Sequence, residues 1–427
     1  MSQPTTAADV IAQLPRSGRV FVHGAAATPR VLLEALVAQA GRFDGLELLH
    51  LHTHGEATWA QVQHAKAFRV TNLFVGENIR KSLDGERVDY LPCFLSEIPN
   101  LFRSGARALD AALVHLSPPD AHGYCSLGTS VDVAQAAIET APLILAQINR
   151  QMPRVHGSGA IHISRVAACV EVDVPLGGAT PEPPDEVHSR IAGHVAGIIE
   201  DGATLQLGIG AIPDAVLAAL SSHRHLGLHT EMFSDGAVPL MQSGAIDNSR
   251  KLVFRGFSAA SFVVGSEALY RHIHDNPSVA LHDAATINNP RLVYKNPKVT
   301  AVNSAVEIDL TGQICADSVG PRIISGVGGQ MDFIRAASLS PGGKPIIAIA
   351  SRTRRGEPRI VPTLASGAGV VTTRAHVHWV ATEWGIANLY GRTLGERAHL
   401  LIGLAHPDDR ERLARAWHDR FASSAVT

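Results

Sequence analysis

One segment near the middle of the chain brings together residue types that could carry out chemistry. An apolar run at 203–207 predicts a buried strand, and a glycine-rich loop follows it at 208–212. Pro213 suits the first turn of a helix, because that position needs no backbone N–H. A second apolar run at 226–230 predicts the next strand, and Glu231 stands directly after it. Ligands of open α/β sheets bind beyond the carboxyl ends of the strands, so we expect the loop, the helix start and Glu231 at one such edge.

Two kinds of chemistry fit this spacing. The first is dinucleotide binding, because two glycines, Gly208 and Gly210, followed about twenty positions on by an acid match a known fingerprint, with Glu231 as the ribose acid. Pro213 stands where that fingerprint needs a third glycine, so the match is incomplete. The second is acyl chemistry, in which the loop N–H groups would hold a phosphate or a developing oxyanion and Glu231 would attack as a nucleophile. A tight turn followed by an ordinary surface glutamate fits the same spacing.

Three histidines in the first half offer a different kind of site. His50, His52 and His54 alternate along the chain, which on a strand would place them on one face, as metal ligands could be. No matching set of carboxylates and histidines is evident further along, so we predict no metal site. A metal-dependent hydrolase built on these residues is kept as a distant alternative. The plainer interpretation makes them a polar strand end or residues that line a cleft.

The first half of the chain repeats the pattern of the glycine-loop segment. A predicted strand, Gly24, Pro29 and an amphipathic helix succeed one another there in the same order. A Leu-His-Thr sequence precedes His54 in the first copy and Glu231 in the second. We therefore infer two related α/β halves, of which only the second carries the acid.

A stretch rich in proline and glycine at 174–185 separates the two halves. Such a stretch cannot form regular structure, so we place the domain boundary there. The prediction is an N-terminal α/β domain of residues 1–180 and a C-terminal α/β domain of residues 181–427.

Composition limits the classes of partner. The 427 residues are 45% hydrophobic, which allows roughly two or three domains with substantial cores. A net charge of -2 gives no electrostatic case for nucleic acid or a membrane surface as a partner. Four scattered cysteines, Cys93, Cys125, Cys169 and Cys315, suggest neither a zinc site nor a disulfide framework. With no secretory signal and no apolar run near the ~18 residues of a membrane span, we expect a cytoplasmic protein.

Six motifs, taken in order, resemble those of one family. They are SPPDAHGYCSLG at 117–128, LGIGAIPDAV at 207–216, LHTEMFSDG at 228–236, SGVGGQMDF at 325–333, VATEWGIANLYG at 380–391 and AHPDDR at 405–410. The chain resembles the acetyl-CoA hydrolase/transferase family, a branch of the class I CoA-transferases, and within it the 4-hydroxybutyrate CoA-transferase type. The resemblance runs nearly end to end. It implies two related α/β domains with the active site in the cleft between them, and a homodimer or a dimer-based oligomer.

The resemblance assigns roles to residues. Glu231 would be the nucleophile that carries CoA as a glutamyl thioester between two carboxylic acids, in a ping-pong reaction with acyl-CoA as substrate and no permanently bound cofactor. The N-terminal domain would form the substrate side, where His54 would face the acyl group, and the C-terminal domain would supply the nucleophile. The residues implied in CoA contact are Gly208, Ile209, Gly210, Ala211, Ile212, Gly328, Gly329 and Lys344.

Alternatives remain open for the reaction and for Lys344. A CoA-binding regulatory protein without turnover is one of them, although the intact Glu231 argues against it. An acyl-CoA hydrolase would use the same Glu231 and let water intercept the anhydride or the thioester. For Lys344, which follows two glycines, the plain alternative is a solvated lysine in a turn.

Overall fold

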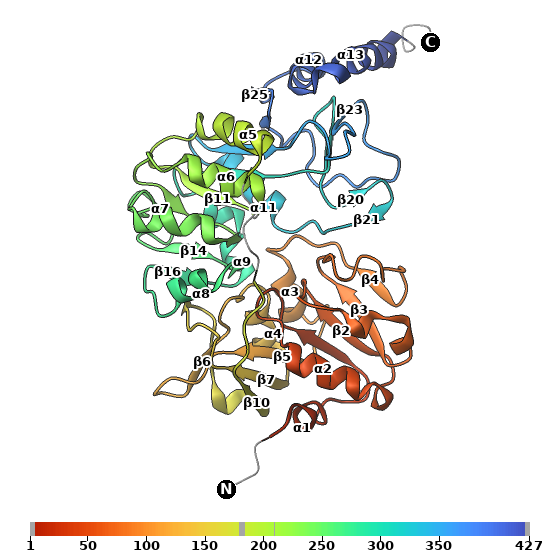
Figure 1. The fold of residues 1–427 in the computed structure, drawn as a ribbon, viewed down its shortest axis with the longest axis vertical. Coiled ribbons are helices and arrows are strands. Elements are labelled where there is room, and N and C mark those ends of the chain that lie inside the picture. Colours follow the sequence, from red (N-terminus) through yellow and green to blue (C-terminus); the bar gives the residue numbers. More distant parts are fainter. Residues whose placement is uncertain (1–4, 179–183, 209, 423–427) are drawn as a thin grey trace. The chain divides into compact units, whose positions relative to one another are not determined.

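A computed structural model describes residues 5–178, 184–208 and 210–422 (Figure 1). The chain folds into two compact units. The first unit is made of Met1–Thr180, Glu231–Asp235 and Phe257–Asn289. The second unit is made of Pro181–Thr230, Gly236–Gly256 and Pro290–Thr427. The boundary predicted at residues 180 and 181 lies outside the described residues, and Glu231 belongs to the first unit.

The first unit is built on a parallel sheet of seven strands in the order β10-β7-β5-β1-β2-β3-β4. The strands are β1 (Arg19–Val22), β2 (Leu46–His50), β3 (Phe68–Asn72), β4 (Val88–Tyr90), β5 (Ala111–Leu116), β7 (Leu143–Asn149) and β10 (Ala168–Val172). Strands covered on both faces are mostly apolar, and all six residues of β5, including the polar His115, are buried. The helices of this part are α1 (Ala7–Ile11), α2 (Arg30–Ala38), α3 (Ile98–Arg103) and α4 (Ala134–Thr140).

Segments from the second half of the chain complete the first unit. The strand that follows Glu231, β13 (Met232–Phe233), pairs in parallel with β15 (Phe262–Val263). The remaining elements are the parallel strands β8 (His156–Gly157), β14 (Ser258–Ala260) and β16 (Val279–Leu281), the antiparallel pair β6 (Tyr124–Ser126) and β9 (Ala160–His162), and the helices α8 (Glu267–Ile273) and α9 (Ala284–Ile287).

The second unit is built on a sheet of six strands in the order β12-β11-β17-β22-β24-β25, parallel except for the last. The strands are β11 (Thr204–Leu207), β12 (Gly227–Leu228), β17 (Thr300–Asn303), β22 (Lys344–Ala348), β24 (Trp379–Thr382) and β25 (Gly385–Asn388). Shorter strands follow β17: β18 (Glu307–Asp309), β19 (Ile314–Cys315), β20 (Ser318–Val319), β21 (Arg322–Ile323) and β23 (Ile360–Val361).

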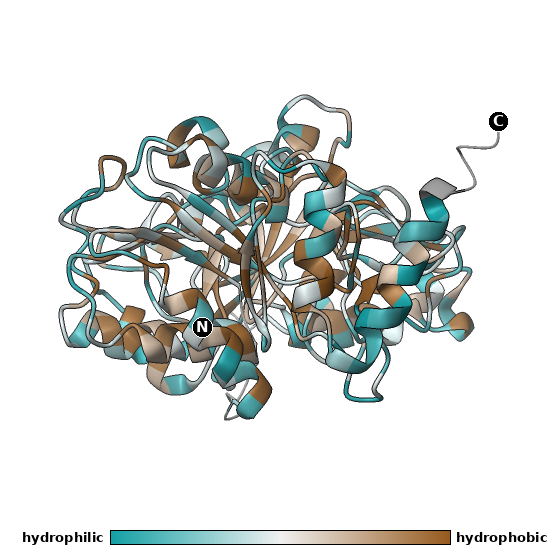
Figure 2. Ribbon diagram, turned by 90° about the horizontal axis from the view of Figure 1, so that it is seen from above, coloured by the Kyte–Doolittle hydropathy of each residue, from teal (hydrophilic) through white to brown (hydrophobic). Residues whose placement is uncertain are grey.

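Helices of the second unit pack against this sheet or against one another, as α5 does on α6 and α11 on β22. They are α5 (Glu186–Ala196), α6 (Ala211–Ala219), α7 (Val238–Gln242), α10 (Pro290–Val293), α11 (Gln330–Leu339), α12 (Leu394–Leu404) and α13 (Pro407–Ala422). Leu401 of α12 and Leu413 of α13 share a buried cluster with Ile347 of β22. In Figure 2 the strands of the sheets are mostly brown, whereas the helix that ends the chain is mostly teal. This contrast reflects the polar sequence of α13.

The structure confirms the predicted fold class, since each unit is an α/β arrangement built on a parallel sheet. The strand predicted at 203–207 is β11, and the helix predicted to start near Pro213 is α6. The apolar run at 299–310 forms two strands, β17 and β18. Within the described ranges, no helix has both the length and the apolar character that a membrane crossing requires.

Candidate active site

The first glycine loop joins the carboxyl end of β11 to the start of α6. Gly210 caps this helix with a φ of 113°, a backbone conformation that residues with a side chain rarely adopt. Ala211 and Ile212 open α6, while Ile209 lies outside the described residues. The first N–H groups of a helix have no partner within the helix, so this end of α6 favours an anion.

The second glycine loop occupies an equivalent place on the neighbouring strand. Gly329 caps α11, and Gly328 has a φ of 56°. The side chain of Gln330, the first residue of α11, donates to the carbonyl of Ser304 at 2.8 Å, directly after the carboxyl end of β17. Because β17 pairs in parallel with β11, both glycine loops lie at the same edge of the six-stranded sheet. Two helix N-termini at neighbouring strand ends suit a ligand that carries phosphates.

The residue directly before Glu231 is tied to the residue directly before the first glycine loop. The Thr230 hydroxyl donates to the carbonyl of Leu207 at 3.0 Å. The N–H of Leu207 lies 3.4 Å from the same hydroxyl oxygen. Both residues are buried, so these bonds fix the position of Thr230, which follows β12, relative to the carboxyl end of β11.

Glu231 is held within the first unit by its backbone and by its side chain. Its carbonyl accepts hydrogen bonds from the N–H groups of Ser261 at 2.8 Å and Phe262 at 3.2 Å. Glu231 is partly exposed, and its carboxylate accepts a hydrogen bond at 2.9 Å from the side-chain amide of Asn288, which is fully buried. A buried amide donor limits the orientations of the carboxylate, while partial exposure leaves it reachable by a substrate.

Asn288, which caps the C-terminal end of α9, is not among the site residues predicted from the sequence. It stands 57 positions after Glu231. The signal in the sequence is that residues 281–290 are polar and rich in asparagine, which predicts a loop but gives neither asparagine a role. Periodicity does not show which of two adjacent asparagines faces a distant carboxylate.

An apolar surface lies beside the backbone of Glu231. The side chains of Ala25, Met232, Phe262 and Val264 form a buried cluster. The ring of His52 packs edge-on against Phe262, with 5.6 Å between the ring centroids. The loop after β1, which contains Ala25, and the segment after Glu231, which contains Met232, therefore meet in this cluster. The loop after β2 packs against it through His52.

His50, His52 and His54 do not converge on a common point. The ring of His50, at the end of β2, packs edge-on against Trp59 at 6.2 Å, and burial lowers its pKa to about 4. The rings of His52 and His54 lie 6.0 Å apart. Across the part of the chain that the structure describes, no group of three or more His, Cys, Asp and Glu side chains could hold a metal ion.

His54 lines a cavity of about 280 Å³ at the carboxyl edge of the seven-stranded sheet. Its backbone N–H donates to the Thr28 hydroxyl at 3.0 Å. Burial and the nearby Arg30 lower the pKa of His54, which favours a neutral ring. The residues that line the cavity are Arg30, Leu33, Glu34, His54, Gly55, Glu56, Thr58 and Trp59.

Lys344 lies apart from the glycine loops. It begins β22, whereas both loops lie at the carboxyl ends of β11 and β17, which are parallel to β22, so it lies at the opposite edge of the sheet. Its ammonium contacts the carboxylate of Glu200 at 2.6 Å, and Lys298 contacts the same carboxylate at 2.6 Å. Hydrogen bonds from Lys298 and Lys344 lower the pKa of Glu200 to about 2. The glycine turn before Lys344 precedes β22, so the lysine lies at the amino end of this strand. This explains why Lys344 is distant from the glycine loops, which lie at the carboxyl ends of the strands.

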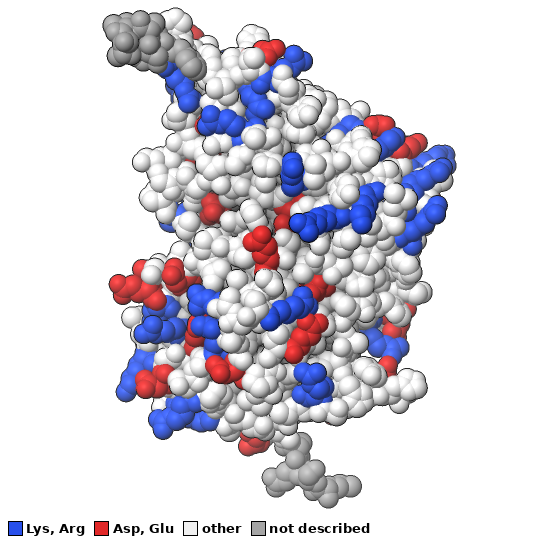
Figure 3. All heavy atoms as spheres, turned by 180° about the vertical axis from the view of Figure 1, so that it is seen from behind, with Lys and Arg blue, Asp and Glu red and all other residues white. Residues whose placement is uncertain are grey.

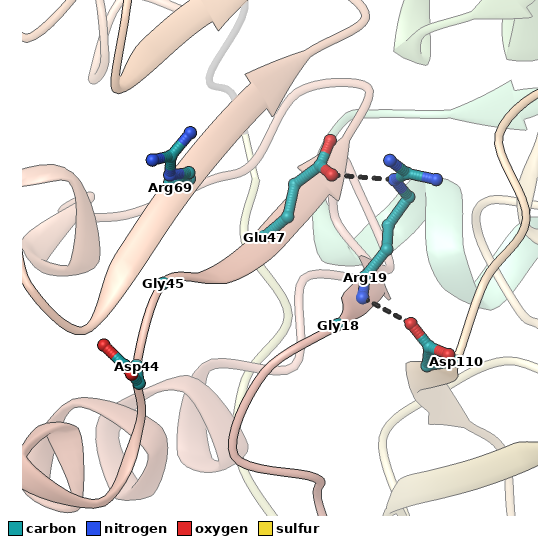
Figure 4. Close-up of a pocket in the computed structure, with 7 residues that line it drawn as sticks. All are labelled: Gly18, Arg19, Asp44, Gly45, Glu47, Arg69 and Asp110. Carbon is teal, nitrogen blue, oxygen red and sulfur yellow. Dashed lines mark hydrogen bonds and ion pairs between the residues drawn. The ribbon is translucent and has the colours of Figure 1, made fainter.

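A second, more open pocket lies at the amino edge of the seven-stranded sheet (Figure 4). Its volume is about 540 Å³, and charged side chains line much of it. Arg19 pairs with Glu47 at 2.8 Å, and its backbone N–H donates to Asp110 at 2.7 Å. None of the predicted site residues lines this pocket. It lies at the edge opposite to His54, so it is separate from the predicted substrate side.

Charges of both signs are mixed on one face of the described residues. On the face shown in Figure 3, Lys and Arg side chains lie among Asp and Glu side chains. This mixture agrees with the net charge of -2. A phosphate-bearing ligand would therefore depend on local groups such as the helix N-termini.

Models of one family match both halves of the chain. The N-terminal domain of acetyl-CoA hydrolase/transferase matches residues 3–176, and the C-terminal domain of acetyl-CoA hydrolase/transferase matches residues 265–417. The chain belongs to the acetyl-CoA hydrolase/transferase family. Within this family it is a CoA-transferase, with acetyl-CoA hydrolases as more distant relatives.

Relatives in the acetyl-CoA hydrolase/transferase family resemble the chain over almost its whole length. The succinyl-CoA:acetate/propanoyl-CoA:succinate CoA transferase of Fasciola hepatica is 49% identical, covering 95% of this chain and 86% of its own. The 4-hydroxybutyrate coenzyme A transferase of Clostridium kluyveri is 42% identical, covering 97% of each. The acetyl-CoA hydrolase of Saccharomyces cerevisiae is 24% identical, covering 89% of this chain and 81% of its own.

Solved structures of this family share the fold. The crystal structure of RipA from Yersinia pestis has a TM-score of 0.93 at 32% identity, covering 97% of each chain. That of 4-hydroxybutyrate CoA-transferase from Porphyromonas gingivalis has a TM-score of 0.83 at 36% identity, covering 98% of this chain and 97% of its own.

Proposed function

We propose that the enzyme transfers CoA between a short-chain acyl-CoA and a carboxylic acid through a glutamyl-CoA thioester on Glu231. The observation that carries the proposal is the partly exposed Glu231, whose carboxylate is oriented by the buried Asn288 amide. The names of the transferase relatives make acetate, succinate and 4-hydroxybutyrate the first acids to test. A homodimer or a dimer-based assembly is part of the same proposal.

In the first half of the proposed reaction, the Glu231 carboxylate attacks the thioester carbon of acyl-CoA. The C–S bond breaks, the CoA thiolate leaves, and a mixed anhydride joins Glu231 to the acyl group. The thiolate then attacks the glutamyl carbonyl, and the first carboxylic acid departs as its carboxylate. Each intermediate stays activated, so the energy of the thioester bond is kept as long as water is excluded.

In the second half, another carboxylate attacks the glutamyl thioester and releases the CoA thiolate. The thiolate attacks the acyl carbonyl of the new anhydride, which forms the product acyl-CoA and regenerates the Glu231 carboxylate. No proton is gained or lost over the cycle. Each addition step places negative charge on a former carbonyl oxygen, and an N–H donor aimed at it contributes about 3 kcal/mol.

The two glycine loops are the proposed source of these N–H groups and of the CoA contacts. Helix N-termini at neighbouring strand ends would hold the phosphates of CoA without a net positive surface. The positions proposed are Gly208, Ile209, Gly210, Ala211, Ile212, Gly328 and Gly329. Lys344 is left out because it lies at the opposite edge of the sheet, and His54 is kept as a candidate for contact with the acyl group.

Hydrolysis by the same glutamate is the second candidate function. The transferase relatives are 42% and 49% identical to the chain, whereas the yeast hydrolase is 24% identical, which favours transfer. In the transferase mechanism, water would intercept the anhydride or the thioester only as a side reaction.

An exchange experiment separates transfer from hydrolysis. A ping-pong transferase should move label from free acetate into acetyl-CoA with no second acid present, because the half-reaction is reversible. Glu231→Gln should abolish this exchange. Release of free CoA at a rate independent of any acceptor acid, with no exchange of label, would show a hydrolase instead.

A further inference from the structure

Strand β12 forms one edge of the six-stranded sheet and leads toward Glu231. On its inner side, the N–H groups of Gly227 and His229 donate to the carbonyls of Ala203 at 2.9 Å and Leu205 at 3.0 Å. Residues of a strand alternate in the direction of their backbone groups, so Leu228 directs its N–H and C=O groups outward. In most sheets such groups would meet water or another strand.

Two buried side chains bind these outward groups. The side-chain oxygen of Asn248 accepts a hydrogen bond from the Leu228 N–H at 2.9 Å. The Lys251 ammonium donates to the Leu228 carbonyl at 2.7 Å. Asn248 is 4% exposed and Lys251 is fully buried. A buried backbone group without a partner is costly, so the two side chains satisfy Leu228 in the way that a neighbouring strand would.

Both side chains suit these positions closely. The stem of Lys251 packs on Gly227, where a Cβ atom would lie 2.6 Å from Lys251 Cγ. Burial lowers the pKa of Lys251 to about 7, and its amine keeps a proton to donate in either charge state. Asn248 has a φ of 57°, a conformation that asparagine tolerates better than most residues.

We propose that Lys251 and Asn248 are positioning residues for the transfer reaction, because they hold from outside the short strand that leads into Glu231. Thr230 holds the same stretch from inside through Leu207. The three residues 228–230 are thus fixed on both sides immediately before the nucleophile. The proposal rests on the proposed function, since it takes Glu231 as the attacking group.

Two substitutions test the outer contacts. Lys251→Met removes the donor and keeps a long apolar stem, and Asn248→Gly removes the acceptor and accommodates the φ of 57°. A displaced nucleophile loses rate, and a misplacement of about 1 Å costs about 100-fold. We therefore expect kcat to fall about tenfold or more in each variant, while KM for acyl-CoA changes less than about twofold.

Matched variants show whether the lost contacts are the cause. Asn248→Asp keeps an acceptor oxygen at the same place and should stay within about threefold of wild-type kcat. Lys295→Met removes an exposed lysine from the same unit and should change nothing. Thermal unfolding of every variant shows the folded fraction. If Lys251→Met does not fold, the kinetics of Asn248→Gly alone test the proposal.

The rate of adduct formation on Glu231 distinguishes this proposal from the proposed function. Slower single-turnover formation of the Glu231 adduct in both variants, at wild-type KM, supports positioning. Wild-type rates in both variants would overturn it, and so would parallel changes in kcat and KM. Absence of any adduct on Glu231 in the wild-type enzyme would instead overturn the proposed function.

Discussion

The chemistry of single residues depends on how Glu231 is held. A carboxylate is a weak nucleophile, so its approach to the thioester carbon must be set by its neighbours. The structure supplies backbone bonds from Ser261 and Phe262 and a side-chain bond from Asn288. The apolar cluster that contains Phe262 lies beside this backbone and provides surface from which water is excluded.

Asn288→Ala should lower kcat about tenfold to 100-fold, because a hydrogen bond to a charged group contributes about 1.5–3 kcal/mol. KM for acyl-CoA should stay nearly constant, since the lost contact acts on the nucleophile. Steady-state kinetics measure both constants. Asn289→Ala, in the same turn, serves as the control, and equal effects of the two substitutions would argue against a specific role for Asn288.

The position of Glu231 after a strand end could be predicted from the sequence, whereas its contact with Asn288 could not, for a physical reason. Glu231 follows a recognisable strand end, where local pattern and position in an α/β fold agree. Asn288 reaches Glu231 only because α9 packs within the first unit, and that contact joins residues 57 positions apart. The folded geometry likewise decides that His50 faces Trp59 while His54 lines a cavity.

Among the elements, the strand-loop-helix units carry the proposed CoA contacts. The sequence predicted β11, the loop and α6 correctly, since apolar runs and glycines are local signals. The predicted length of β12 was too great, because the strand was expected at 226–230 and is observed at Gly227–Leu228. Periodicity does not show that the outer partners of that strand are the side chains of Asn248 and Lys251.

Gly210→Ala should lower kcat/KM for acyl-CoA about tenfold or more, because a Cβ atom at a φ of 113° forces the loop N–H groups to turn. Among the described residues other than its chain neighbours, a Cβ atom there would meet no atom within 4 Å, so the effect should come from the backbone and not from a clash. Gly193→Ala, within α5, is the control. It should raise the free energy of unfolding by about 0.5–1 kcal/mol and leave kinetics unchanged. A wild-type kcat/KM for Gly210→Ala would contradict the assigned role of the loop.

At the scale of the whole molecule, the sequence predicts two domains of consecutive residues, whereas each compact unit is made of several separate segments of the chain. Two segments of the second half, Glu231–Asp235 and Phe257–Asn289, belong to the compact first unit. Composition and linker signals locate a boundary along the chain, but they do not reveal segments that return to an earlier unit. The α/β character of both units followed from apolar runs alternating with helical patterns, and both main sheets are parallel except for the last strand of the second.

Acidification should destabilise the first unit through its buried histidines. Burial lowers the pKa of His50 to about 4 and that of His115 to about 3, and it also lowers the pKa of His23. The unfolded chain takes up these protons first, so the stability is fully present above about pH 6.5 and is lost as the pH falls toward the folded values. At pH 5, His50 and His115 should each lower the free energy of unfolding by about 2 kcal/mol relative to its value above pH 6.5.

Thermal unfolding between pH 7.5 and 4.5 measures this effect. His50→Phe should make the unfolding temperature less sensitive to pH, because it removes one buried titrating group and keeps a ring against Trp59. His418→Phe changes an exposed histidine and should leave the pH dependence as it is. An unchanged pH dependence in His50→Phe would show that His50 is not among the groups that cause acid sensitivity.

The most direct test of the central claim is trapping of the covalent intermediate. The enzyme is incubated with acetyl-CoA and then with borohydride, which reduces a glutamyl thioester to an alcohol, and the product is examined by intact mass and peptide mapping. The account predicts a single modification on the peptide that contains Glu231, absent in Glu231→Gln. If the wild-type enzyme turns over acetyl-CoA while Glu231 stays unmodified, the nucleophile assignment is wrong, and Glu231 would act as a general base toward water.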